Sequence, residues 1–184
     1  MDVKEAIIKR RAYRSLKDTI ITEELIKDLA TTASLAPSCR NKQPWRFVFV
    51  YEKEVKEKLH TALSPGNEWA YASSMIVAVF SNKELDCQIK GIEYYLFDTG
   101  MAVAFLILRA TELGLVAHPI AGYDEEKVKA ILNIPQEMRV VALIIIGKKS
   151  EELTDLLTEK QKEVEEKRPE RLPLEAFCYF NTYK

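Results

Sequence analysis

The chain has 184 residues, of which 47% are apolar and 30% charged, and its formal net charge is −1. This length fits a single domain, 1–184, with a core of its own, and the composition is that of an ordinary soluble protein. The balanced charge excludes a general attraction to nucleic acid or to anionic membranes, so any bound anion needs a local cluster of cations.

We expect neither a signal peptide nor a membrane span. The charged start, Met1 to Glu5, lacks the apolar run of a signal peptide, and the longest apolar stretch, Met138–Gly147, falls far short of the roughly 20 residues that cross a bilayer. The cysteines are odd in number, widely spaced and without a CxxC pattern, so they predict neither a disulfide framework nor a metal site. They are Cys39, Cys87 and Cys178. We expect a cytoplasmic protein.

The first half of the chain predicts helices and two buried strands. Residues 3–11 suit a short helix that ends in a basic cluster. Thr22 then suits the N-cap of a second helix, which Pro37 ends. Apolar and β-branched runs predict strands, and helical spacing predicts a helix between them. These three elements are Arg46–Tyr51, Lys53–Ala62 and Met75–Phe80.

The second half opens with the longest predicted helix, Ile92–Leu113, which Gly114 closes. A strand end or loop follows at Leu115–Gly122, and Asp124 caps a short helix to Leu132. Val140–Ile146 is apolar on both faces, which predicts a central strand. The charged segment Glu151–Lys167 predicts a half-exposed helix, and an apolar tail, 168–184, ends the chain.

This order of elements predicts an α+β fold, because strands and helices do not alternate as βαβ units. No GxGxxG or GxxxxGK[ST] motif occurs, so a Rossmann or Walker site is not expected. The long helix is apolar almost all round, and the tail is apolar as well. One domain of this size cannot easily bury both, so we expect a homodimer that packs the long helices together and exchanges the C-terminal arms.

Two basic segments lie at opposite ends of the sequence. Lys9–Arg14 and Lys167–Pro173 are both rich in arginine, whose planar guanidinium suits phosphate. The alternative for each is a solvated helix end.

Two loops stand between these basic segments. Ala36–Trp45 is stiffened by two prolines and rich in polar side chains, so it suits recognition of a polar heterocycle or is a plain connection, with Trp45 in the core. Gly114–Gly122 has small residues that let the backbone approach a flat ligand. His118 in this loop is either a general acid or structural.

The sequence resembles the nitroreductase family nearly end to end. Arg10-Arg11-Ala12-Tyr13-Arg14 is similar to the family's R-R-S-x-R, and APSCRNKQPWRFVFV is similar to its A-P-S-x-x-N-x-Q-P-W-x-F-x-V-V. The pieces Glu112–Leu115 and Arg171–Glu175 follow in family order. The resemblance implies the nitroreductase-like fold, with a central, mostly antiparallel sheet flanked by helices, and FMN at the interface of a homodimer.

The resemblance also implies roles for single residues. The N-terminal motif would contact the FMN phosphate, ribityl chain and ring edge, with only a backbone contact left where Ala12 replaces serine, and Arg171 would bind the phosphate, assisted by Lys148 or Arg168. A loop from the partner subunit, with Pro37, Ser38 and Asn41, would reach the flavin. Asn67 and the backbone N–H groups after His118 would contact the flavin ring. The implied cofactor-binding residues are Arg10, Arg11, Ala12, Arg14, Pro37, Ser38, Asn41, Asn67, Pro119, Ile120, Ala121, Gly122 and Arg171.

The implied activity is hydride transfer from NADH or NADPH, through flavin N5, to nitroaromatic, quinone or enone acceptors by a ping-pong mechanism. The flavin carries this chemistry, so no catalytic side chain is expected. A flavin-binding storage or redox-sensing protein, and a structural dimer without flavin, are the alternatives. Only about ten residues, Ser81–Lys90, separate the second strand from the long helix, so we expect a compact member with an open substrate site.

Overall fold

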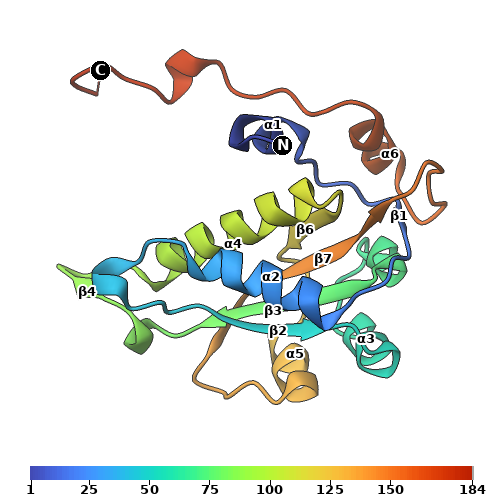
Figure 1. Cartoon of the computed structure of the whole chain (residues 1–184), viewed down its shortest axis with the longest axis horizontal. Helices are drawn as coiled ribbons and strands as arrows, with labels where there is room; N and C mark the ends of the chain where they lie inside the picture. The colour runs from blue at the N-terminus through green and yellow to red at the C-terminus, as the bar shows by residue number, and fades with distance from the viewer. Residues whose placement is uncertain (184) are drawn as a thin grey trace.

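The computed structural model describes residues 1–183 and combines a central sheet with helices on both sides (Figure 1). The strands are β1 Leu16–Lys17, β2 Arg46–Val50, β3 Met75–Ser81, β4 Gln88–Ile89, β5 Ile92–Glu93, β6 Val116–Ile120 and β7 Arg139–Lys149. The α-helices are α1 Val3–Lys9, α2 Glu23–Ser34, α3 Lys53–His60, α4 Tyr95–Glu112, α5 Glu125–Leu132 and α6 Glu159–Glu166. Four short 3-10 helices are η1 Cys39–Asn41, η2 Glu68–Ala72, η3 Lys83–Leu85 and η4 Leu174–Ala176.

The longest strand, β7, organises the sheet. It pairs with β3 along one edge and with β6 along the other, its C-terminal end pairs with β1, and β2 continues the sheet beyond β3. All of these pairings are antiparallel. The predicted α+β class, the mostly antiparallel sheet and the central place of the strand around Val140–Ile146 are therefore confirmed.

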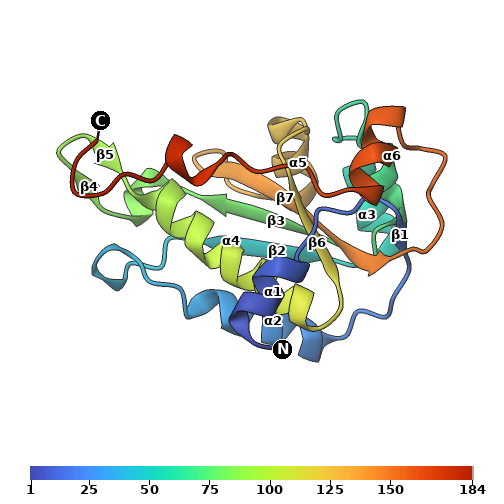
Figure 2. The ribbon, with the colours of Figure 1, turned by 90° about the horizontal axis from the view of Figure 1, so that it is seen from above.

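The two central strands are apolar on both faces because each face builds a separate core. Along β7, Leu143 and Ile145 belong to one core, while Ile144 and Ile146 belong to the other. This alternation follows from the two-residue period of a strand. Leu59 of α3 and Val128 of α5 join the first core, whereas α2 and α4 supply the second. Helices therefore cover both faces of the sheet (Figures 1 and 2).

Several predicted boundaries are confirmed by side-chain caps. The hydroxyl of Thr22 accepts a hydrogen bond from the Leu25 N–H at the start of α2, and Asp124 does the same for Lys127 at the start of α5. Gly114 follows α4 with φ +76°, the left-handed conformation expected just after a helix.

The helix predicted over 3–11 ends at Lys9, and Arg10 turns the chain into an extended segment. The helix predicted from Ile92 begins at Tyr95 instead. Ile92 belongs to β5, which pairs with β4 across a two-residue turn at Lys90 and Gly91, where φ is +53° and +82°. Such turns favour the twist of a hairpin, so this short hairpin takes up the residues before α4.

The prediction of one helix over Glu151–Lys167 is wrong in its first half. α6 begins only after Thr158, whose side chain and that of Gln161 cap each other's backbone N–H groups in a capping box. The preceding segment is a turn that buries Leu157. The sequence T-x-x-Q carries the signal for this start.

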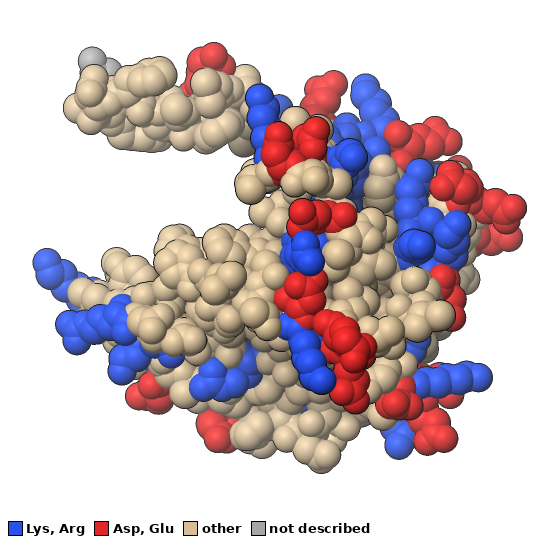
Figure 3. Space-filling view, in the orientation of Figure 1, with Lys and Arg blue, Asp and Glu red and all other residues tan. Residues whose placement is uncertain are grey.

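The long helix is not buried on all sides within one chain. α4 packs on α2 and α1, but Leu96, Phe97 and Phe105 are 48%, 64% and 37% exposed. Ile7 and Ile8 of the neighbouring α1 are exposed too. In Figure 3 the surface around α4 is almost free of charged residues, whereas Lys, Arg, Asp and Glu gather at the opposite end of the molecule. We call the exposed apolar residues of α1 and α4 the apolar face.

The C-terminal arm, from residue 168 onward, leaves α6 and stands away from the body of the molecule (Figures 1 and 3). Its large apolar side chains are exposed, including Leu172, Phe177 and Phe180 at 70%, 60% and 83%. The arm therefore finds little to pack on in its own chain. No helix among residues 1–183 has the length and apolarity to cross a membrane.

Candidate functional site

The two basic segments of the sequence meet in space. Five arginines from the segment after α1 and the segment after α6 surround a hollow of about 160 Å³, which Ala12, Val164 and Pro169 complete. We call these five residues the arginine cluster: Arg10, Arg11, Arg14, Arg168 and Arg171. The two basic segments therefore share one hollow, although their side chains remain partly exposed to solvent.

Two of the arginines hold the chain ends together. Arg11 Nη2 donates to the carbonyl oxygens of Val164 and Glu165, at 2.5 and 3.2 Å. In the other direction, Arg168 Nη2 donates to the carbonyl of Ile8 at 2.5 Å and to that of Arg10 at 2.8 Å. These reciprocal bonds to main-chain oxygens fix the rim of the hollow.

The remaining arginines of the cluster make no salt bridge among residues 1–183, although the charge of Glu165 acts on Arg14. Burial, together with the positive charges of Arg168, Arg171 and Arg11, lowers the pKa of Arg10. Burial also lowers the pKa of Arg14, and its Nη1 is buried without a hydrogen-bond partner among the described residues. Like charges held together with an unused donor favour binding of an anion, since an anion would relieve both.

A buried carboxylate beneath the cluster escaped the sequence analysis. Glu165 of α6 is 5% exposed, and it accepts hydrogen bonds from the backbone N–H groups of Arg14 at 2.6 Å and Ser15 at 3.2 Å. The residue lies in a run of charges that reads as a solvated helix, so only the tertiary contact distinguishes it from its neighbours.

His118 lies behind the cluster as a buried, uncharged ring. It stacks on Trp69 with ring centroids 4.7 Å apart, and its Nδ1 lies 3.1 Å from the carbonyl oxygen of Tyr13. Because a carbonyl only accepts, Nδ1 carries the ring proton. Burial, with smaller contributions from Arg14 and Arg10, lowers the pKa of His118 to about 4. A ring that is neutral and stacked at neutral pH fits the structural alternative for His118 rather than the general acid.

The loop after His118 and the predicted residue Asn67 come together. Asn67 Nδ2 donates to the carbonyl of Gly122 at 3.1 Å, and the backbone N–H of Ser64 donates to the same oxygen at 3.0 Å. A Cβ on Gly122 would lie 2.5 Å from Asn67 Nδ2, so glycine permits this close approach. The N–H groups of Ala121 and Gly122 donate to no group in residues 1–183. We call residues 119–122, which are the last two residues of β6 and the two that follow it, the β6 loop.

The predicted partner-subunit loop lies far from the arginine cluster within one chain. Pro37, Ser38 and Asn41 surround η1 at the end of the molecule that holds β4 and β5, whereas the cluster lies toward α6 (Figures 1 and 2). Ser38 Oγ accepts a 3.0 Å hydrogen bond from the Gln43 N–H, which closes the loop. Lys148, an expected assistant of Arg171, does not line the hollow, while Arg168 does.

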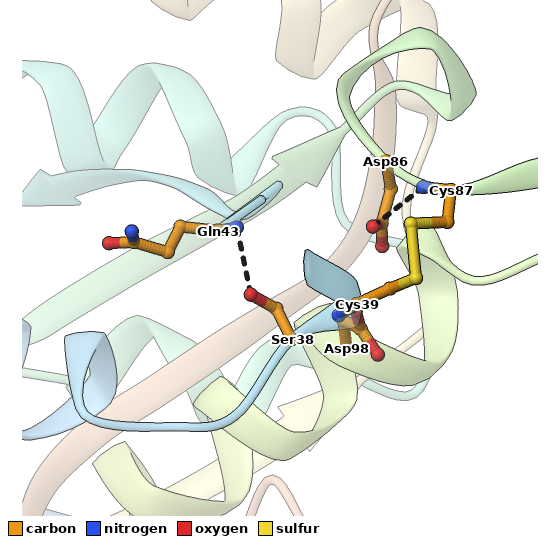
Figure 4. The surroundings of a disulfide bond; sticks show 6 residues. All are labelled: Ser38, Cys39, Gln43, Asp86, Cys87 and Asp98. Carbon is orange, nitrogen blue, oxygen red and sulfur yellow. Dashed lines mark hydrogen bonds between the residues drawn. A yellow bond between two sulfur atoms is a disulfide. The ribbon is translucent and has the colours of Figure 1, made fainter. Parts of the chain in front are cut away.

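A disulfide anchors this loop, and it corrects the prediction that the cysteines form no disulfide framework. Cys39 of η1 is bonded to Cys87, just before β4, with Cα atoms 6.0 Å apart (Figure 4). The two positions are 48 residues apart, so their spacing gave no sign of the pairing. The Cys39 N–H also donates to Asp98 Oδ2 at 2.6 Å. Burial and then the charge of Asp98 raise the pKa of the neighbouring Asp86.

The chain matches the model of the Nitroreductase family over residues 7–68 and 66–148. A protein of Thermus thermophilus described as an NADH dehydrogenase is 25% identical over 83% of this chain and 89% of its own. A nitroreductase family protein from Clostridium novyi NT has a solved structure with 31% identity and a TM-score of 0.77, covering 82% of this chain and 87% of that one.

A third relative matches almost end to end. The solved structure of an oxidoreductase containing FMN is 25% identical, with a TM-score of 0.85 over 100% of this chain and 94% of its own. The family match covers more than half of the sequence, in agreement with the motifs at both chain ends. The chain belongs to the nitroreductase family, as an oxidoreductase of the nitroreductase type.

Proposed function

We propose that this protein is an FMN-dependent oxidoreductase, with 1–184 as one flavin-binding domain that transfers hydride from NAD(P)H to small organic acceptors. The arginine cluster is the observation that carries this proposal. FMN ends in a single phosphate of charge near −2, and bidentate guanidiniums suit its oxygens. The relatives' descriptions, which include FMN and NADH, point to the same chemistry.

The residues present fit a bound FMN. Arg10, Arg14 and Arg171 would hold the phosphate, because Arg11 and Arg168 already donate to main-chain carbonyls. The buried, unpartnered Nη1 of Arg14 is a donor that such a phosphate would satisfy. Ala12 contributes only its backbone at the rim of the hollow.

The β6 loop would bind the flat ring. The N–H groups of Ala121 and Gly122 are unused within the described chain, and the close approach of Asn67 to Gly122 keeps this loop in place. Pro119 and Ile120 would border the ring on the same loop. Bound FMN supplies the hydride chemistry, and the protein binds and orients it. His118, buried and neutral, supports the loop and transfers no proton in this proposal.

A second copy of the chain would complete the site. We propose a homodimer in which Pro37, Ser38 and Asn41 reach the flavin of the partner, since they lie far from the arginine cluster of their own chain. The apolar face and the exposed arm support this assembly, because both leave large apolar side chains in water. A two-fold contact between α4 helices would bury them, with each arm exchanged onto the other subunit.

The acceptors we propose are nitroaromatics, quinones and enones, reduced in a ping-pong cycle in which NAD(P)+ leaves before the acceptor enters. Anaerobic titration with NADH and with NADPH, followed by an acceptor of each class, tests this directly. Bleaching of the flavin and its return with an acceptor, together with parallel double-reciprocal plots, is the expected result. Flavin that binds but resists reduction by both nicotinamides would favour a storage or sensing protein instead.

The flavin site itself is tested by binding. Arg10→Ala and Arg171→Ala each remove a charge-assisted contact of about 1.5–3 kcal/mol, which corresponds to roughly 10- to 100-fold weaker FMN binding. The matched control is Lys160→Ala, which removes a cation from α6 without lining the hollow. Unchanged FMN affinity in a chain that carries both Arg10→Ala and Arg171→Ala would contradict the proposed site, and a wild-type chain that binds no FMN would contradict the function.

A further inference from the structure

A second group of reactive side chains lies at the opposite end of the molecule from the arginine cluster. The disulfide between Cys39 and Cys87 is flanked by two carboxylates, Asp86 from the same segment as Cys87 and Asp98 from the first turn of α4 (Figure 4). None of these residues contributes to the flavin site in the proposed function through a side-chain contact.

Two observations indicate that this group can do more than hold a loop. The two sulfur atoms and a carboxylate oxygen of Asp86 lie within 4.8 Å of one another, so three potential metal ligands converge on one point. Asp86 is 8% exposed, and its Oδ2 is buried without a hydrogen-bond partner among residues 1–183. Its Oδ1 accepts from the Cys87 N–H at 2.7 Å, and the same carboxyl lies beside Asp98, so the unpartnered oxygen is favourable only with a shared proton or a cation.

We propose that the reduced Cys39–Cys87 pair, together with Asp86, is a binding site for one thiophilic divalent cation such as Zn²⁺. Thiolate sulfur and carboxylate oxygen are ligands that Zn²⁺ takes in tetrahedral sites. Asp98 holds the loop in position, since its Oδ2 accepts from the Cys39 N–H. Water on the partly exposed side of Cys39 completes the four ligands.

The metal-bound dithiolate and the disulfide are alternative states of Cys39 and Cys87. A dithiol reductant supplies two electrons and two protons, which break the S–S bond into two thiols while the reductant becomes a disulfide. The cation then displaces both thiol protons and any proton on Asp86, because only the deprotonated groups are ligands. The reductant reaches the pair through Cys39, which is more exposed than Cys87.

The local geometry allows the change. Two thiolates on one tetrahedral Zn²⁺, each bound at about 2.3 Å, lie about 3.8 Å apart. The Cα atoms are 6.0 Å apart, so rotation about the Cα–Cβ bonds separates the sulfurs with little movement of the backbone. Cys39 also begins η1, a single irregular turn in which Arg40 and Asn41 have φ of +50° and +57°, and such a turn adjusts more easily than a regular helix or strand.

Cobalt(II) provides the test, because thiolate ligation gives it a charge-transfer absorption band that carboxylate or water ligation does not. The full chain is reduced with a water-soluble phosphine, freed of phosphine by anaerobic gel filtration, and titrated with Co²⁺. We expect three titratable thiols, one Co²⁺ per chain, the thiolate band, and its loss when Zn²⁺ is added. No flavin is needed, so this result is independent of the proposed function.

Three controls locate the site. The unreduced chain, in which only Cys178 is free, and the double variant Cys39→Ser with Cys87→Ser should both lack the band. Cys178→Ser should keep it, and Asp86→Asn, which removes a charged ligand, should weaken Co²⁺ binding by roughly tenfold or more, since loss of a group that only supports a ligand already costs that much. A reduced wild type without the band, a band that persists in the double serine variant, or a disulfide that the phosphine cannot open in the native chain would each overturn the proposal.

Discussion

The carboxylate of Glu165 accepts a 2.6 Å hydrogen bond from the backbone N–H of Arg14, and so joins the two ends of the chain beneath the arginine cluster. Its other oxygen accepts from the Ser15 N–H at 3.2 Å. The bonds hold the backbone from which the Arg14 guanidinium reaches the hollow. The position of a proposed phosphate ligand therefore depends on a residue of the opposite charge.

Glu165→Gln should destabilise the fold and weaken FMN binding. The amide offers one acceptor oxygen and turns an NH₂ group toward a backbone N–H, so we expect a loss of about 1–3 kcal/mol in the free energy of unfolding. Urea denaturation measures it. Glu163→Gln, exposed on the same helix, is the matched control and should stay within about 0.5 kcal/mol of the wild type. Equal effects of both variants would contradict the role of Glu165.

Gly122→Ala should displace Asn67. The added Cβ would lie 2.5 Å from Asn67 Nδ2, so the amide must rotate away and lose its bond to the Gly122 carbonyl. The expected loss is about 1 kcal/mol in the free energy of unfolding, with weaker FMN binding because the β6 loop is less constrained. In an Asn67→Ala background the same substitution should have little effect. If the losses in the free energy of unfolding of the two single variants add in the double variant, the added Cβ does not act through Asn67.

The strands and caps could be predicted because their signals are local. The β-branched runs around Phe47 and Ile76 form the paired strands β2 and β3, and the side chains of Thr22 and Asp124 cap N–H groups three residues further along the chain. The motifs at both chain ends also indicated which arginines gather at one site. Local period, capping chemistry and family motifs were sufficient for these features.

The other features depend on contacts between distant segments. β1 has only two residues and exists because Leu16 and Lys17 pair with the end of β7. The residues next to Cys39, Cys87 and Glu165 in the sequence give no signal for the disulfide or for the burial of the carboxylate. In the sequence, Cys39 lies in a loop, Cys87 in a connecting segment and Glu165 in a charged helix. Sequence patterns alone therefore could not identify the disulfide or the buried carboxylate.

Phe97→Asp should prevent association of the chains. Phe97 is 64% exposed on the apolar face, so the substitution removes little from the core of one chain, yet it would place a charge inside the proposed dimer contact. Sedimentation should show a monomer, while circular dichroism stays unchanged. Ile20→Asp is the control, because Ile20 is 84% exposed and belongs to neither α1 nor α4. A Phe97→Asp chain that remains dimeric would contradict the proposed interface.

His118 should make the protein less stable as the pH falls from neutral toward 4. Its pKa is about 4 in the folded chain against 6.5 for the free side chain, because burial disfavours the charged ring. Between these values the unfolded chain binds the proton and the folded chain does not, so the free energy of unfolding decreases as pH decreases, and the loss is complete below about pH 4. Lowering the pH from 7.5 to 5 should therefore remove about 2 kcal/mol through this residue alone.

Denaturation of the wild type and of His118→Gln at both pH values isolates this contribution, since glutamine does not titrate and the other groups are common to both proteins. The difference between the two pH values should be smaller in the variant by about 2 kcal/mol. His60→Gln is the comparison, because burial lowers the pKa of His60 as well, but its ring is less buried than that of His118, so a smaller change is expected. If the pH dependence of His118→Gln equals that of the wild type, His118 binds its proton equally well in the folded and unfolded chains, and its assignment as a buried ring that stays neutral is wrong.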